Sequence, residues 1–178
     1  MSRRDAAWLA HARSQKCFGL KGPSAAEALE QRGFSVPVRP NSWSPLRMGE
    51  RDGSSNVIAR LGSAEFFVAE DGEAPGAAAL EADELPGTYP VLREDFGLIV
   101  GGSRVDDVLA QVCNVNLATL PQPKTVVLTL MIGVGVLVLP QLSEGDGPIY
   151  RIWCDPSFGT YLWNELEEIV QKIPDGRA

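Results

Sequence analysis

Two stretches of the sequence decide the fold: FGLKGPSAAEALEQRGFSV at residues 18–36 and FGLIVGGSRVDDVLAQVCNVN at residues 96–116. Each opens with an apolar run typical of a strand, passes a glycine, and continues with apolar residues at helical spacing. Three pairs of identical residues fall at a constant offset: Gly22 with Gly102, Leu29 with Leu109, and Gln31 with Gln111. We interpret this match as an internal duplication of a strand–helix–hairpin unit. The alternative is that any capped strand–helix unit produces such a match by chance.

Both helices expected in these stretches have a serine at their start. Ser24 is followed three residues later by Glu27, and Ser103 by Asp106, which is the spacing of a capping box. We expect each serine to cap its helix, and Gly33 to end the first one.

The strongest helix signal lies near the C-terminus. Asp155 is predicted as the N-cap and Pro156 as the first helical residue. Apolar residues then recur at spacings of three and four, which predicts a stripe facing the core. Its members are Phe158, Tyr161, Leu162, Leu166, Ile169 and Ile173.

Antiparallel strands are predicted between the helices. The expected strands are residues 57–61, 65–69, 125–131, 134–139 and 148–154. The uncharged run Thr125–Pro140 is shorter than the ~20 apolar residues of a membrane span, and Gly133 and Gly135 interrupt it. We therefore predict two buried strands joined by a tight turn near these glycines. Residues 36–55 are rich in proline, glycine and serine and are expected to form a long surface loop.

The order of these elements indicates an α+β fold. We expect two strand–helix–hairpin repeats that form an antiparallel or mixed sheet with helices on one face. The predicted divisions are an N-terminal tail at 1–16, a single domain at 17–173 with repeat one at 17–70, a linker at 71–87 and repeat two at 88–173, and a C-terminal tail at 174–178.

Charge and cysteine content narrow the classes of partner. The net charge of −7 argues against nucleic acid and against an anionic membrane, because both attract basic surfaces. Three cysteines, without a closely spaced pair, fit a reduced cytoplasmic compartment and support neither a zinc ribbon nor a dithiol motif. The first 16 residues contain no apolar run of signal-peptide length.

The sequence offers few residues for catalysis. His11 is the single histidine, and we expect it to be a solvated residue of the tail rather than an acid–base catalyst. We predict no catalytic residue and no metal site, and the sequence identifies no cofactor-binding residue. Gly133-Val134-Gly135 is half of a dinucleotide fingerprint, and we interpret it as a turn.

Four tryptophans are more informative: Trp8, Trp43, Trp153 and Trp163. Trp153 is predicted in the core. The other three either anchor a partner protein or are buried when loops fold back, and the long loops favour a partner.

Two segments carry a resemblance to a known family. TYPVLREDFGLIVGGSRVDDVLAQVCNVNL at residues 88–117 and IYRIWCDPSFGTYLWNELEEIV at residues 149–170 resemble the gamma subunits of heterotetrameric sarcosine oxidase. A looser similarity covers GPSAAEAL and ARLGSAEFFV. The resemblance implies a shortened relative of the folate-binding fold of the glycine-cleavage T-protein. The acidic motif of folate-binding relatives has no clear match, because Glu70 and Asp71 in VAEDGEA lie in a different context.

This resemblance implies a non-catalytic, structural subunit that assembles with larger catalytic subunits of a flavin-dependent amine-demethylating oxidoreductase. FMN, FAD, NAD or tetrahydrofolate would then belong to the partner subunits. The alternatives are a gamma-type subunit of another secondary-amine monooxygenase or dehydrogenase, for example one acting on dimethylamine, and a tetrahydrofolate-binding module. An independent aminomethyltransferase-like enzyme is disfavoured by the missing acid–base residues.

Overall fold

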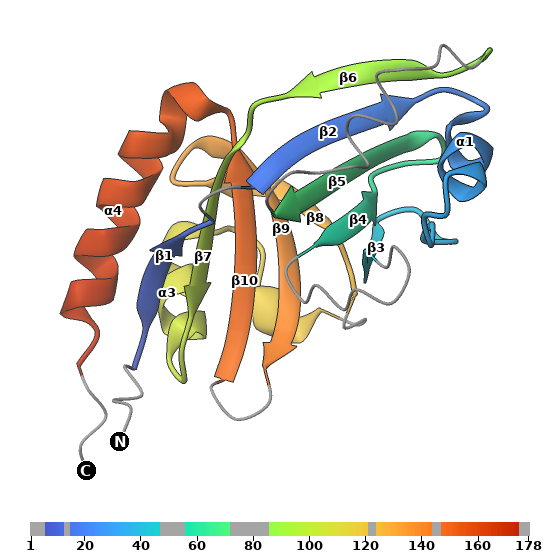
Figure 1. Ribbon diagram of the computed structural model, residues 1–178. Helices are drawn as coiled ribbons and strands as arrows, with labels where there is room; N and C mark the ends of the chain where they lie inside the picture. The colour runs from blue at the N-terminus through green and yellow to red at the C-terminus, as the bar shows by residue number, and fades with distance from the viewer. Residues whose placement is uncertain are drawn as a thin grey trace. The chain divides into compact units, whose positions relative to one another are not determined.

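The computed structural model describes residues 6–12, 15–46, 56–71, 86–120, 124–143 and 147–174. Contacts divide the chain into two compact units, one formed by residues 14–94 and the other by residues 95–178 together with residues 1–13. Each unit contains one five-stranded antiparallel sheet (Figure 1). The α+β class predicted from the sequence is confirmed.

The unit of residues 95–178 has the strand order β1-β7-β10-β9-β8. Its strands are β1 (Trp8–His11), β7 (Phe96–Gly101), β8 (Val127–Met131), β9 (Val134–Ser143) and β10 (Gly147–Cys154). The predicted strands in this part of the chain are thus confirmed, and the uncharged run forms β8 and β9. The prediction that both strands are buried was wrong for β8, because its alternate residues Leu128 and Leu130 are exposed. In the part of the chain that the structure describes, no helix combines the length and the apolar character that crossing a membrane requires.

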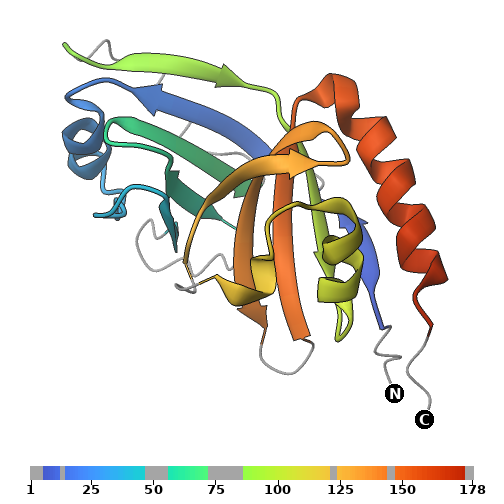
Figure 2. The same ribbon diagram turned by 180° about the vertical axis from the view of Figure 1, so that it is seen from behind.

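Two α-helices cover one face of this sheet (Figure 2). Helix α3 (Val105–Val112) buries Val105, Val108, Leu109 and Val112, the apolar residues at helical spacing in the second of the two matched stretches. Helix α4 (Gly159–Lys172) buries Leu162 and Leu166 against the same core, which includes Val100 and Ile152 from the sheet. Two short 3-10 helices, η1 (Leu117–Thr119) and η2 (Pro156–Phe158), follow α3 and precede α4.

The unit of residues 14–94 has the strand order β3-β4-β5-β2-β6. Its strands are β2 (Gln15–Lys21), β3 (Ser42–Pro45), β4 (Val57–Arg60), β5 (Glu65–Asp71) and β6 (Tyr89–Arg93). The hairpin of β4 and β5 was predicted, whereas β3 lies within the predicted surface loop, so that prediction was wrong for Ser42–Pro45. Residues 47–55 of this loop lie outside the described residues.

One α-helix, α1 (Ala25–Gln31), packs on this second sheet among the described residues. Its buried residues Ala25, Ala28 and Leu29 join a core with Phe66 and Val68 of β5. Apolar side chains at positions two apart in β5 point to this core because alternate residues of a strand face the same side.

The N-terminal tail was predicted incorrectly. Trp8–His11 form strand β1, whose Trp8 pairs with Gly101 and whose His11 pairs with Leu98 of β7. A four-residue strand has little local signal, and its pairing partner lies about 90 residues away in the sequence. Sequence periodicity alone therefore could not identify it.

The two edge strands β1 and β6 are exchanged relative to the sequence repeats. Strand β1 directly precedes β2 but pairs with β7, and β6 directly precedes β7 but pairs with β2. The predicted repeats at 17–70 and 88–173, with the linker at 71–87, describe the duplication along the sequence and stay a prediction. The contacts follow a different division, with its boundary between Glu94 and Asp95.

Two matched glycines turn the chain from strand to helix in both units. Gly22 and Gly102 both have φ of +119°, a backbone conformation that favours glycine. The amide of Ser24 donates to the Gly87 carbonyl oxygen at 3.2 Å, and the amide of Arg104 donates to the Ala6 carbonyl oxygen at 2.7 Å. The same geometry at both matched positions supports the interpretation of an internal duplication.

The predicted capping boxes do not form. No side-chain hydrogen bond caps α1 or α3, and the N-cap of α3 is Arg104 rather than Ser103. Asp155 does cap a helical turn, because its Oδ1 accepts a hydrogen bond from the Ser157 amide at 2.9 Å. That turn is η2, and α4 begins three residues later than the N-cap signal predicted.

Candidate functional site

A surface hollow lies beside α3 and the segment that follows it. Its volume is about 350 Å³, and its lining residues include Asp106, Asp107, Cys113, Asn114 and Asn116. The asparagine at 116 caps η1, since its Oδ1 accepts from the Ala118 amide at 3.2 Å. The hollow is therefore lined by two carboxylates and by Asn116, whose side chain already stabilises the backbone of η1.

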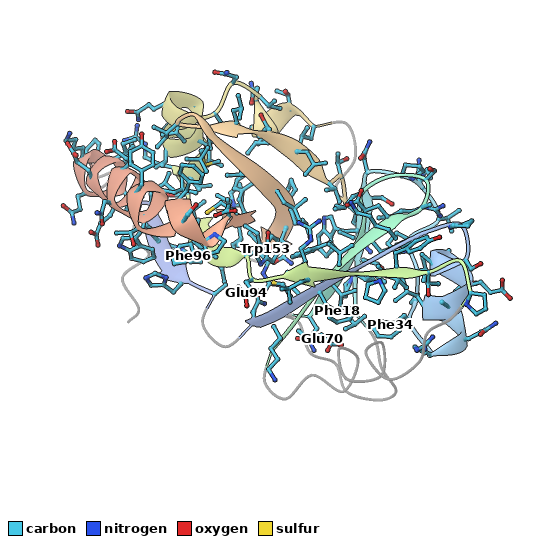
Figure 3. The ribbon with its side chains drawn as sticks, turned by 90° about the horizontal axis from the view of Figure 1, so that it is seen from above. Phe18, Phe34, Glu70, Glu94, Phe96 and Trp153 are labelled. Atoms are coloured by element: carbon cyan, nitrogen blue, oxygen red, sulfur yellow. The ribbon has the colours of Figure 1, made fainter. Side chains whose placement is uncertain are left out.

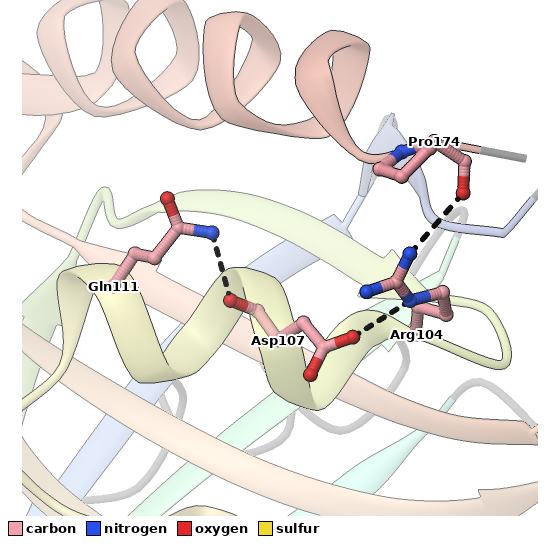
Figure 4. Close-up of polar contacts among 4 residues, drawn as sticks. All are labelled: Arg104, Asp107, Gln111 and Pro174. Atoms are coloured by element: carbon pink, nitrogen blue, oxygen red, sulfur yellow. Dashed lines mark hydrogen bonds and ion pairs between the residues drawn. The ribbon is translucent and has the colours of Figure 1, made fainter.

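Both carboxylates of the hollow are hydrogen-bonded within the unit. The Tyr150 hydroxyl of β10 donates to Asp106 Oδ1 at 2.7 Å. Arg104 Nε donates to Asp107 Oδ2 at 2.7 Å, and Arg104 Nη1 donates to the Pro174 carbonyl oxygen at 3.3 Å (Figure 4). These contacts fasten α3 to β10 and to the end of α4, so the acidic pair is structural.

Tyr150 is the most strongly perturbed of these groups. Burial, and then the hydrogen bond and the charge of Asp106, raise the pKa of its phenol well above the usual value. The phenol consequently stays protonated and remains a donor to Asp106 across the physiological pH range.

The single histidine occupies a place that the sequence did not predict. His11 is half-buried in β1, and its ring stacks on Trp163 of α4 with centroids 3.8 Å apart and planes at 2°. Phe96 contacts the same imidazole edge-on at 5.2 Å. The interpretation as a solvated tail residue was wrong, because α4 and β7 enclose this ring. An imidazole held between two aromatic rings serves packing.

The cysteines are buried or half-buried thiols. Cys113 and Cys154 are buried and Cys17 is intermediate, and among the described residues none of the three forms a disulfide. Burial, followed by the charges of Asp155 and Asp95, raises the pKa of Cys154 to about 11, which disfavours the nucleophilic thiolate. Across the described residues, no group of three or more His, Cys, Asp or Glu side chains is arranged to hold a metal ion.

The tryptophans do not form the exposed anchors that the sequence suggested. Trp43 and Trp153 are buried, with 7% and 1% of their surface exposed. Trp8 packs over Gly101, where an added Cβ would lie 2.5 Å from Trp8 Cζ2, and Trp163 stacks on His11. The prediction of a core position was correct for Trp153, whereas Trp43 folds into strand β3 and is buried there.

Two buried charges interrupt the apolar strands. Glu70 at the end of β5 is 2% exposed, and Arg151 in β10 is 3% exposed (Glu70 and Trp153 are labelled in Figure 3). The Arg151 guanidinium carbon lies 5.6 Å from the centroid of the Trp153 ring, within the range of a cation–π contact. The sequence analysis considered Glu70 only as part of a possible acidic motif and did not identify Arg151. An arginine within the apolar strand sequence IYRIWC is itself an indication of a buried charge.

Several large apolar side chains are exposed on the described surface of each unit. In the unit of residues 95–178 they are Leu128, Leu130, Phe158 and Tyr161, and in the unit of residues 14–94 they are Val38, Tyr89 and Leu92. Phe158 and Tyr161 were predicted to face the core and do not, because the helical stripe that packs begins at Leu162. Exposed apolar side chains indicate a docking surface only where they form a contiguous patch.

Comparison with known proteins identifies the fold. No family model matches the chain, and no curated protein matches it in sequence. The two antiparallel sheets with their helices are an aminomethyltransferase-related fold, as the resemblance predicted. In particular, 99% of the chain matches 90% of a chain of heterotetrameric sarcosine oxidase from Corynebacterium sp. U-96, with a TM-score of 0.74 and 17% identity.

A second structure shares this fold over part of its length. The chain is similar to the glycine cleavage system aminomethyltransferase T from Bartonella henselae, with a TM-score of 0.66 and 18% identity. This match covers 92% of the chain but only 46% of the aminomethyltransferase. The chain thus spans about half the length of that enzyme.

Proposed function

We propose that this chain is a small, non-catalytic subunit of a heteromeric, flavin-dependent oxidoreductase that demethylates amines, similar to heterotetrameric sarcosine oxidase. The observation that carries the proposal is the fold match over 99% of this chain and 90% of the other. A match across nearly the whole of both chains favours a counterpart of one subunit over a fragment of a larger enzyme.

The described side chains support a structural role. The single histidine is stacked on Trp163, the acidic pair beside α3 is bonded to Tyr150 and Arg104, and the buried Cys154 thiol has a raised pKa. General acid–base and nucleophilic catalysis need such groups to face a substrate in an accessible site. In this proposal FMN, FAD, NAD or tetrahydrofolate is bound by the larger, cytoplasmic partner subunits.

The test is purification of the tagged chain from its native host, followed by identification of co-purifying chains and an absorbance spectrum. Larger chains in fixed stoichiometry that carry flavin are the expected result. The chain arriving alone and colourless would refute the proposal. A haem spectrum would instead indicate a monooxygenase for another secondary amine, such as dimethylamine.

A tetrahydrofolate-binding module is the second candidate, favoured by the likeness to an aminomethyltransferase. Titration calorimetry of the full chain with tetrahydrofolate separates the two functions. Saturable heat with the isolated chain would support the binding module, and its absence is expected for the structural subunit.

A further inference from the structure

We draw no further inference here: the strongest candidate, the apolar surface of Pro90 and Leu92 on edge strand β6 at the place where α4 covers the matched strand β1, carries no proposal because nothing among the described residues shows what covers it.

Discussion

The two compact units contain the same sheet built from matched parts. Strands β3, β4, β5, β2 and β6 follow one another in the unit of residues 14–94, and β8, β9, β10, β7 and β1 do so in the other unit. The register also agrees, because Lys21 pairs with Tyr89 at the place where Gly101 pairs with Trp8. The two matched stretches of sequence thus lie in two sheets of one topology, with the edge strands exchanged, as a duplication would predict.

The differences lie in what covers each sheet. In the unit of residues 95–178, α3 and α4 both pack on the core, and β8 and β9 form a long hairpin. In the unit of residues 14–94, α1 is the described α-helix, and β3 and β4 are four residues each. The strand order is therefore common to both units, whereas the described helices and the lengths of the hairpin strands differ.

The largest effect on folding is expected when the chain is cut between the two predicted sequence repeats. Fragments 1–80 and 81–178 each lack one edge strand of their own sheet, because β1 pairs with β7 and β6 pairs with β2. We expect neither fragment to melt cooperatively alone, since both lose a row of backbone hydrogen bonds and expose apolar surface. An equimolar mixture should recover the circular dichroism of the intact chain and elute as one complex.

Fragments that are mixed in a 2:1 ratio serve as the control, because only half of the excess fragment can then join the complex. A cooperative melting transition of either fragment alone, as a monomer, would show that the exchanged strands are dispensable.

The matched glycines provide the next largest effect. An added Cβ at Gly102 would lie 2.6 Å from the Ala6 carbonyl oxygen, and at Gly22 it would overlap the Gly87 carbonyl oxygen. Because both residues also have φ of +119°, Gly22→Ala and Gly102→Ala should each lower the free energy of unfolding by about 1–3 kcal/mol or more. Urea denaturation measures the change.

Gly62→Ala is the matched control, since an added Cβ there meets no atom within 4 Å. It should be neutral or slightly stabilising because alanine restricts the unfolded chain. A similar loss for all three variants would mean that the strand-to-helix turns are not special positions.

Local sequence patterns were sufficient to predict an element where the residues that it packs against or pairs with are near in the chain. The stripe on α3 was predicted from its helical spacing, and the strands around Gly133 from an uncharged apolar run divided by glycines. Strand β1 and the burial of Trp43 depend on pairing with distant strands, which a single sequence does not display. The stripe of α4 was extended too far toward Phe158 because periodicity continues past the point where the packed core ends.

The candidate site was less predictable than the fold. The resemblance carried by residues 88–117 and 149–170 led to the correct fold relationship. The exposure of Leu130 was not predicted, because a leucine in an apolar run is indistinguishable by sequence from its buried neighbours. His11 illustrates the reverse case, because its stacking on Trp163 joins residues about 150 positions apart.

A smaller effect comes from a position where the two units differ in chemistry. By register, Phe66 of β5 matches Tyr150 of β10, and Ala26 of α1 matches Asp106 of α3. Tyr150→Phe should cost about 1–2 kcal/mol of unfolding free energy, because Asp106 loses its 2.7 Å donor. The double variant with Asp106→Ala reproduces the Phe66–Ala26 pair and should recover most of the loss.

The pH dependence of stability gives a second measurement of the same pair. The folded-state pKa of Tyr150 is raised above its unfolded value of about 10, so the unfolded chain loses this proton first as pH rises. The stability contributed by Tyr150 is therefore complete below about pH 10 and declines above it. Tyr150→Phe should flatten this alkaline decline, and an unchanged slope would contradict the assignment.

The smallest expected effect contrasts two predicted helix caps. Asp155→Ala removes the acceptor for the Ser157 amide and should lower Tm by roughly 2–4 °C, whereas Ser24→Ala should leave Tm unchanged because its side chain makes no cap hydrogen bond. The pKa of Asp155 is lowered by the bonds from Ser157, so its contribution is present above its unfolded pKa and lost as pH falls through the folded value. Differential scanning calorimetry at neutral and acidic pH should therefore show the two variants differing only at neutral pH. Equal Tm values at both would mean that the cap of η2, which begins the connection to α4, contributes nothing to the stability of the chain.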